Sequence, residues 1–483
     1  MEFNSLSFIV FFIAACLPCW LMPSGRGRLA WLVLASCLFY AASGPASLLL
    51  LAIITAVNYA AAMKVAAARA GRPQACRLIV AAAVLLDLGN LALFKYANFF
   101  LEAGGGLVSA FMHIDALPRL TGLFIPLGIS FYTFQLIAYI VDVGRGACEP
   151  IADPLEMALF ASFFPKMSAG PIIRTKEFIP QLKAPAPLSC ARLLQGADLI
   201  FIGLFKKIII ADQIAPFADK VFAAPDGLGF CAALLGVYTY TVQIYCDFSG
   251  YMDIALGCAC LLGFQLPPNF NFPYLSVNII DFWRRWHMTL SGWLRDYLYI
   301  PLGGSRGGRL VTYRNLFITM ALAGLWHGAN WTFVVWGLWH GAALILTRYA
   351  HDLKGVAAEQ PLFSGKLYRA LAMAITFHVV GFGWVFFRAP DCLTALKIFK
   401  AVFSFRLFGP SDLVAFGVIQ LSIMAATLAA LFFMQIGAYW GAKKQFRSTW
   451  LWGITRPAVY FLIIALIALM ANQSAKQFIY FQF

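Results

Sequence analysis

Apolar runs long enough to cross a lipid bilayer recur from one end of this chain to the other. A helix needs about 20 predominantly apolar residues to cross the hydrocarbon core. The candidate spans are 5–22, 29–42, 46–63, 78–98, 122–142, 155–173, 194–213, 229–246, 250–266, 314–327, 330–347, 370–388, 414–436 and 457–472. Several are short or broken by Gly and Pro, so we expect about eleven full transmembrane helices plus re-entrant and amphipathic helices. The pattern predicts an all-α polytopic membrane protein.

Composition and charge support this class. Of the 483 residues, 61% are hydrophobic and 12% are charged, and the charged fraction is about half that of a soluble domain. The net charge of +15 comes from Lys and Arg in the short connections, which is the bias of cytoplasmic loops. We therefore expect a lipid environment and no nucleic-acid partner. Arg26 and Arg28 place the first connection in the cytoplasm, so the N-terminus is predicted on the opposite side.

No charged or Ser/Pro-rich linker interrupts the chain. We expect one integral domain over 1–483, with N-terminal helices in 1–120 and a motif-bearing core in 121–483. The eleven cysteines lie mostly in apolar stretches. The pairs Cys16/Cys19 and Cys258/Cys260 have spacings that occur in metal or redox sites, but neither has a second ligand pair nearby, so no metal site is predicted and no cofactor is expected to stay bound. The sequence contains no GxxxxGK[ST], GxSxG or HExxH motif, and nucleotide hydrolysis or soluble-type serine chemistry has no support.

The hexapeptide GLWHGA occurs twice within residues 324–342 and places His327 and His340 in a stretch without charged residues. An ionisable side chain in lipid is costly and usually functional. Thirteen residues on one helix correspond to a rotation of about 220°, so the two histidines face one cavity only if the helix breaks, and Gly328 and Asn330 offer a place for that. From composition alone, hydrogen bonding to a neighbouring helix is an equally good interpretation. A neutral imidazole is also the usual general base for a hydroxyl.

An aromatic and polar segment, residues 247–314, interrupts the apolar runs. It is too polar to cross lipid and too aromatic for a simple soluble loop, so an amphipathic or re-entrant helix is predicted. Trp286, Trp293 and Tyr297 follow at spacings of seven and four, which places them on one helical face. Together with Trp283 they are expected to anchor the segment at the membrane interface.

Charged residues of this segment are candidates for binding a donor. Asp281, Arg284 and His287 are expected to cluster on another side of the helix. Arg284, Arg285, Arg295 and Arg306 could bind a phosphorylated cofactor at the cytoplasmic face, and interfacial snorkelling would produce the same pattern.

Other charged side chains have less distinctive settings. Asp247 and Asp253 are six residues apart, on roughly opposite faces of a helix, so pairing with Arg or holding a turn is favoured over a shared acid/base pair. Lys206 and Lys207 are interpreted as ordinary interface charges. In FFPKMSAGPIIR, a re-entrant Gly-Pro turn is predicted, with Lys166 in water.

Several long motifs are similar to those of one known family. They are PLGISFYTFQLIAYIVDVGRG, FFPKMSAGPIIR, YCDFSGYMDIALGCACLLGFQLPPNFNFPY, DFWRRWHMTLSGWLRDYLYIPLGGSRGG, GLWHGANWTFVVWGLWHG and FIYFQF. They run from about residue 120 to the end of the sequence. In these motifs the chain resembles the membrane-bound O-acyltransferases, and within them the bacterial branch that O-acetylates exopolysaccharides such as alginate.

This resemblance implies the fold of that family and its chemistry. It implies that an acetyl group is taken from a cytoplasmic thioester, acetyl-CoA, and passed through the membrane core. The family's invariant histidine falls on His327, the expected general base, and its second recurrent histidine falls on His287, which would position the thioester. His340 is expected mainly as a packed second copy. The residues expected in the pore or at the donor are Asp281, Arg284, Arg285, Trp283, Asn330, Trp326, His340, Asp247 and Asp253.

The resemblance also implies a setting for the reaction. The chain would lie in the bacterial inner membrane as a multi-pass protein with a periplasmic N-terminus. Periplasmic partner proteins of the SGNH type would finish transfer to a polysaccharide acceptor. Two alternatives stay open: transfer of D-alanine or another acyl group to a cell-wall polymer, and a non-enzymatic channel or flippase for a lipid-linked sugar.

Overall fold

The computed structural model describes residues 3–23, 25–112, 119–356, 363–409, 412, 449–470 and 478–479, except the side chains of 106–112, 449–454 and 470. Within these ranges all regular structure is helical, which confirms the all-α prediction. The candidate span 414–436 lies outside the described residues, as do the last four residues of FIYFQF. The chain divides into two compact units, Met1–Ile200 with Met252–Pro268 and Phe201–Tyr251 with Asn269–Phe483. A single domain over 1–483 stays a prediction.

Three helical segments among the described residues are long and apolar enough to cross a membrane. They are Pro45–Arg69, Pro73–Gly105 and Lys366–Arg388. Leu6–Leu21 and Thr455–Leu469 are shorter apolar helices. The count of about eleven full spans stays a prediction.

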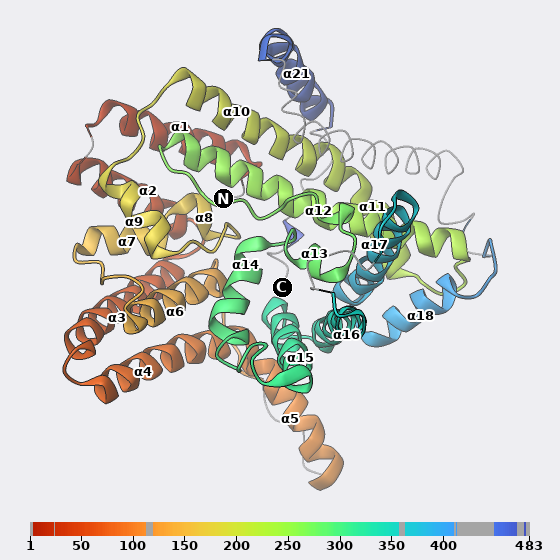
Figure 1. The fold of residues 1–483 in the computed structure, drawn as a ribbon. Helices are drawn as coiled ribbons and strands as arrows, with labels where there is room; N and C mark the ends of the chain where they lie inside the picture. Colours follow the sequence, from red (N-terminus) through yellow and green to blue (C-terminus); the bar gives the residue numbers. More distant parts are fainter. Residues whose placement is uncertain are drawn as a thin grey trace. The chain divides into compact units, whose positions relative to one another are not determined.

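The first unit is built from helices that Figure 1 colours red to yellow. They are α1 (Leu6–Leu21), α2 (Arg26–Ala41), α3 (Pro45–Arg69), α4 (Pro73–Leu91), the π-helical turn η1 (Ala92–Tyr96), α5 (Ala97–Met112), α6 (Ile129–Arg145), α7 (Pro154–Ser162), α8 (Phe164–Met167), α9 (Thr175–Lys183) and most of α10 (Cys190–Leu204). Helices α3, α4 and α6 pack against one another. Proline occupies the first position of α3 and of α4, where its missing N–H costs nothing.

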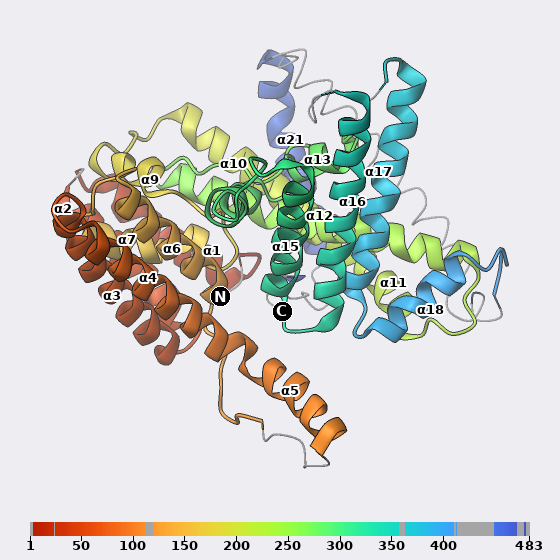
Figure 2. The same cartoon turned by 60° about the horizontal axis from the view of Figure 1, so that its bottom comes forward.

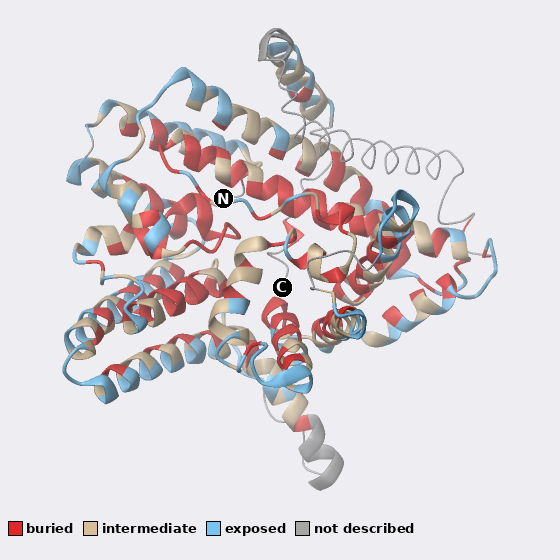
Figure 3. Ribbon diagram, in the orientation of Figure 1, coloured by how far each residue is buried: buried red, intermediate tan, exposed pale blue. Residues whose placement is uncertain are grey.

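Exposed residues recur along α3 and α4, coloured pale blue in Figure 3, and many of them have large apolar side chains. They include Leu49, Ile53, Leu78 and Leu85. An apolar surface this extensive is not stable against water, and it is the surface that lipid tails cover in a membrane protein.

The FFPKMSAGPIIR segment is broken, as predicted, but the prediction that its lysine stays in water is wrong. Lys166, in α8, is buried and donates a hydrogen bond to the Phe160 carbonyl. Its ammonium lies 4.7 Å from the centre of the Phe160 ring and 5.2 Å from that of Phe178. Aromatic faces attract a cation, so aromatic packing takes the place of water around this amine.

The second unit holds the remaining helices. They are η2 (Phe205–Ala211), α11 (Asp212–Ala223), most of α12 (Phe230–Leu261), the short turn η3 (Pro273–Leu275), α13 (Ile279–Trp283), α14 (Met288–Leu294), the π-helical turn η4 (Arg295–Tyr299), α15 (Gly308–His327), α16 (Trp331–Lys354), α17 (Lys366–Arg388), α18 (Cys392–Val402) and α21 (Thr449–Met470). Helices α15, α16 and α17 lie side by side in Figure 2, with α16 in contact with both neighbours.

Glycines of the doubled hexapeptide bring α15 and α16 into backbone contact. A Cβ atom added to Gly324 would lie 2.2 Å from the Phe333 carbonyl oxygen, and one added to Gly337 would lie 2.2 Å from the Met320 carbonyl oxygen. The two glycines also face each other, since the same Cβ on Gly324 would lie 3.1 Å from the Gly337 Cα. Each copy of GLWHGA therefore supplies the small residue that lets the other helix approach, as in membrane helix pairs with small residues four apart.

We expect Gly324→Ala or Gly337→Ala to separate these helices and to lower the free energy of unfolding by about 1–3 kcal/mol, because backbone atoms on the partner helix cannot move aside. Gly89→Ala on α4 is the matched control, since a Cβ there meets no atom within 4 Å and alanine is the better helix former. Thermal unfolding of the purified variants in detergent measures both effects. Unchanged stability in the two hairpin variants would contradict the packing role.

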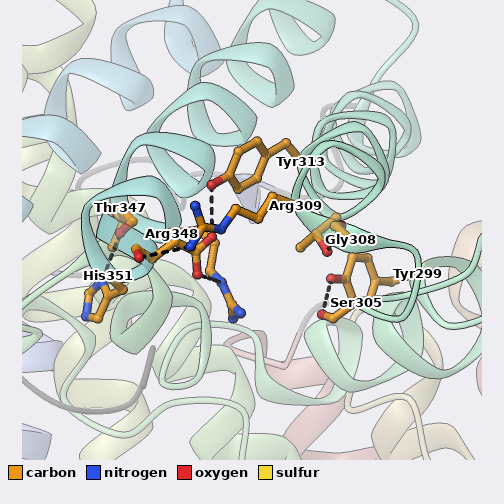
Figure 4. Close-up of polar contacts among 10 residues, drawn as sticks. Tyr299, Ser305, Gly308, Arg309, Tyr313, Thr347, Arg348 and His351 are labelled. Carbon is orange, nitrogen blue, oxygen red and sulfur yellow. Dashed lines mark hydrogen bonds and ion pairs between the residues drawn. The ribbon is translucent and has the colours of Figure 1, made fainter. Parts of the chain in front are cut away.

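The other end of the α15–α16 hairpin is tied by charged and polar side chains (Figure 4). The Tyr313 hydroxyl donates to Asp352 Oδ2 at 2.8 Å, and Arg348 Nε donates to Asp352 Oδ1 at 3.1 Å. Arg309 donates to the Asp352 carbonyl at 3.3 Å. The start of α15 is thus joined to the last turns of α16, and the hairpin is held at both ends.

Candidate active site

His327 is the last residue of α15, immediately before the predicted break. Gly328 is extended, and Asn330 caps α16 by accepting a hydrogen bond from the Thr332 amide at 3.0 Å. The Asn330 side chain also donates to the Pro390 carbonyl at 2.9 Å. The structure confirms that the helix breaks at Gly328–Asn330. It gives Asn330 a capping role in this break.

The break brings both histidines of the repeat onto one tryptophan. The ring centre of Trp336 lies 5.0 Å from that of His327 and 4.9 Å from that of His340. Phe387 packs 5.1 Å from His327, and Trp283 packs 5.3 Å from His340. Both imidazoles are buried. His340 is therefore packed, as predicted, but it shares its tryptophan neighbour with His327.

His287 lies in a strained turn between α13 and α14. Its backbone has a φ of 43°, a left-handed conformation that non-glycine residues rarely adopt and that is enriched at functional sites. The ring is fully buried and packs 4.9 Å from Phe248 and 6.3 Å from Trp326. Trp326 in turn packs 4.9 Å from the adjacent His327 ring. Trp326 therefore packs against both His287 and His327, the two histidines that the family motifs select.

Asn269 holds this turn in place and was not identified from the sequence. Its side-chain oxygen accepts hydrogen bonds from the Thr289 amide at 2.9 Å and the Thr289 hydroxyl at 2.7 Å. Its carbonyl accepts from the Met288 amide at 3.0 Å. The signal was its place between the prolines of LPPNFNFP, where Asn commonly orders a turn through its side chain.

A cavity of about 410 Å³ opens within the second unit. Its lining is mostly apolar, and its polar residues are Arg284, Ser291, Arg295, Tyr299 and Thr319. Trp283 lines it as well, so the ring that packs on His340 is also a wall of the cavity. An apolar pocket of this size with a few polar groups is typical of small-molecule sites.

Comparison with known proteins assigns the chain. It is 39% identical to the "Probable alginate O-acetylase AlgI" of Pseudomonas aeruginosa over 93% of this chain and 83% of that one. It is 39% identical to the "Peptidoglycan O-acetyltransferase" of Helicobacter pylori over 77% of this chain and 73% of that one. The chain belongs to the membrane-bound O-acyltransferase family. It is a membrane-bound O-acyltransferase.

The family's own model matches residues 150–353. This range holds His287, His327 and His340 together with the cavity. A more distant relative, the "Teichoic acid D-alanyltransferase" of Bacillus subtilis, is 34% identical over 54% of this chain and 68% of that one. The resemblance drawn from the motifs is confirmed.

The structure separates the charged residues of the DFWRRWH motif. Asp281 Oδ1 accepts a hydrogen bond from Arg285 Nε at 2.7 Å, which makes an ion pair between residues four apart in sequence. The other oxygen of Asp281 accepts a hydrogen bond from the Val277 amide. Arg284 points to the cavity instead. The predicted cluster of Asp281, Arg284 and His287 is wrong, because α13 ends at Trp283 and the chain turns before His287.

The tryptophans predicted as interface anchors are buried. Trp286 packs 4.9 Å from Trp384, and Trp293 packs 5.3 Å from Tyr297. The single helical face predicted for them does not form, because the segment divides into α13, α14 and η4. The anchoring prediction is therefore wrong for Trp283, Trp286 and Trp293, whose rings fill the protein interior.

Asp247 belongs to a buried group of ion pairs. Its carboxylate lies 2.5 Å from Lys207 Nζ and accepts a hydrogen bond from the Ile479 amide at 2.9 Å. Lys207 also pairs with Asp212 at 2.9 Å. The prediction that Lys207 is an ordinary interface charge is wrong, since it is buried. Asp253 belongs to the first compact unit and is half-buried.

Proposed function

We propose that this protein takes an acetyl group from acetyl-CoA on the cytoplasmic side and passes it through the membrane for O-acetylation of an exopolysaccharide such as alginate. The Pseudomonas aeruginosa relative, named "Probable alginate O-acetylase AlgI", aligns with 93% of the chain. The second unit holds both the cavity and the buried imidazoles of His287, His327 and His340, which supply chemistry suited to acyl transfer. In this proposal the protein lies in the inner membrane with its N-terminus in the periplasm.

The observation that carries the proposal is the position of His327 at the helix break, between Trp336 and Phe387. We assign it the role of general base. It takes the proton from the accepting hydroxyl, whose oxygen attacks the thioester carbonyl carbon. The tetrahedral intermediate then expels the CoA thiolate, which receives the proton. The aromatic surroundings exclude water, which would otherwise hydrolyse the thioester.

The cavity beside Trp283 is suited to the donor. Arg284 and Arg295 present guanidiniums that match phosphate geometry, and the apolar walls suit a pantetheine arm. His287, in its strained turn, is assigned to positioning the thioester. Trp326 and His340 would shape the passage, while Asn330, Asp281 and Arg285 support it through the hydrogen bonds described above.

Arg284 and Arg285 are adjacent but should respond differently to substitution. We expect Arg284→Ala to raise the KM for acetyl-CoA about tenfold or more, since a charge-assisted hydrogen bond to phosphate is lost. Arg285→Ala should leave that KM unchanged and cost at most about 1 kcal/mol of stability, since its partly exposed pair with Asp281 is worth little. Steady-state kinetics in membrane vesicles measures the first quantity. Equal KM values for acetyl-CoA in the two variants would show that the donor does not bind in this cavity.

The acceptor is tested in cells that lack their own polymer acetylase. The chain, expressed with periplasmic SGNH-type partners, should restore acetyl esters on the secreted polysaccharide. The same cells are assayed for acetyl groups on peptidoglycan and for D-alanyl esters on the cell wall, because relatives carry those activities in their names. Esters confined to the cell wall would replace the exopolysaccharide proposal.

A further inference from the structure

A cluster of buried polar side chains joins α3, α4 and α6 in the first unit, away from the histidines. Asp87 lies near the middle of the apolar segment Pro73–Gly105 and is fully buried. Asn58 on α3 donates to its Oδ1 at 2.8 Å. Tyr132 on α6 is buried as well, near enough to Asp87 for the two groups to interact electrostatically. A carboxyl group at this depth is costly and marks a functional site more often than not.

Oxygen atoms of this cluster lack hydrogen-bond partners within the described part of the chain. They are Asp87 Oδ2, Asn58 Oδ1 and Tyr132 Oη. All three side chains are at least nine-tenths buried. Asp87 accepts the hydrogen bond from Asn58, but neither lysine nor arginine pairs with it among the described residues. Its charge therefore has no cation beside it in this part of the chain.

We propose that this cluster, Asn58, Asp87 and Tyr132, binds a sodium ion. Hard cations prefer carboxylate, amide and hydroxyl oxygens, which are the groups left without partners here. One carboxylate among neutral oxygens is neutralised by a single positive charge, whereas a divalent ion would leave a net charge buried in apolar surroundings. The π-helical turn η1, which begins five residues after Asp87, adds a second local irregularity of the kind frequent at functional sites.

The ion would stabilise the packing of α3, α4 and α6. The test measures the apparent melting temperature of the full-length protein in detergent, in sodium chloride and in choline chloride at equal ionic strength. At sodium concentrations about a hundred times the Kd, we expect the melting temperature to rise by about 3 °C. Asp87→Asn keeps the shape of the side chain and removes its charge, so its melting temperature should be the same in both salts.

Two further variants complete the experiment. Glu149→Gln alters an exposed carboxylate of the same unit and should keep the full sodium response. Tyr132→Phe removes one neutral oxygen and should move the half-saturating sodium concentration upward, which gives a reading even if Asp87→Asn fails to fold. Equal melting temperatures of the unaltered protein in the two salts would overturn the site. Stabilisation by acid alone, identical in both salts, would overturn it in favour of a protonated carboxyl group.

Discussion

Replacing His327 by alanine should abolish polymer acetylation while leaving the protein in the membrane at its normal level. A positioned general base contributes about 10²–10⁴-fold to the rate, and the side chain contacts the aromatic rings that shape the site. The acetyl content of the secreted polymer measures the effect, and the amount of polymer secreted is measured with it. Secretion should be unchanged.

His378→Ala is the control for this experiment. His378 also lies on a helix of the second unit, α17, but its Nε2 is 2.6 Å from the Tyr238 hydroxyl, outside the rings around Trp336. Its loss should leave acetylation intact. Full acetylation in His327→Ala would exclude the catalytic assignment, and loss of secretion would favour a transport function. His340→Phe, which keeps a packed ring, should retain more activity than His327→Phe if His327 is the base.

Removing the amine of Lys207 by Lys207→Met should lower the free energy of unfolding by about 3–5 kcal/mol, because it leaves the buried carboxylate of Asp247 without its cation. Asp212 loses its ion pair with Lys207 in the same variant. The Ile479 amide alone would then face the Asp247 carboxylate. Thermal or denaturant unfolding in detergent measures the loss, and we expect a low folded yield at 37 °C.

Lys397→Met provides the matched comparison. Lys397 pairs with Asp226 at 2.7 Å, a similar distance, but the two side chains are 39% and 75% exposed. An exposed pair contributes at most about 1 kcal/mol. Equal losses in the two lysine variants would show that burial of the Lys207 pair has no energetic consequence. Adding Asp247→Asn to Lys207→Met should recover part of the loss, since the unpaired charge is then removed.

The helices and the break at Gly328–Asn330 could be predicted because their causes are local. Long apolar runs require helix in lipid, and Asn is among the residues preferred at the N-cap of a helix. The family could be recognised because the motifs around His287 and His327 are long and specific. These features depend on neighbours in sequence.

The environment of single charges and aromatic rings could not be predicted in the same way. Both Lys166 and Lys207 are buried. The partners of Lys166 lie 6 and 12 residues away, where the chain turns back, and Lys207 pairs with Asp247, 40 residues away. Trp286 at an interface and Trp286 in a core obey the same spacing rule, so periodicity could not distinguish them. The repeated hexapeptide suggested two equivalent histidines, but its glycines serve helix packing and its histidines differ in surroundings.

The backbone contact between Gly324 and Gly337 has a consequence for motion during turnover. Closely packed interfaces of this kind do not deform continuously, so α15 and α16 should move together as one rigid element. His327, His340 and Trp336 would then keep fixed separations throughout the reaction cycle. Opening a path for acetyl-CoA or releasing CoA must come from elements outside the hairpin, such as the short helices α13 and α14 with their strained turn at His287.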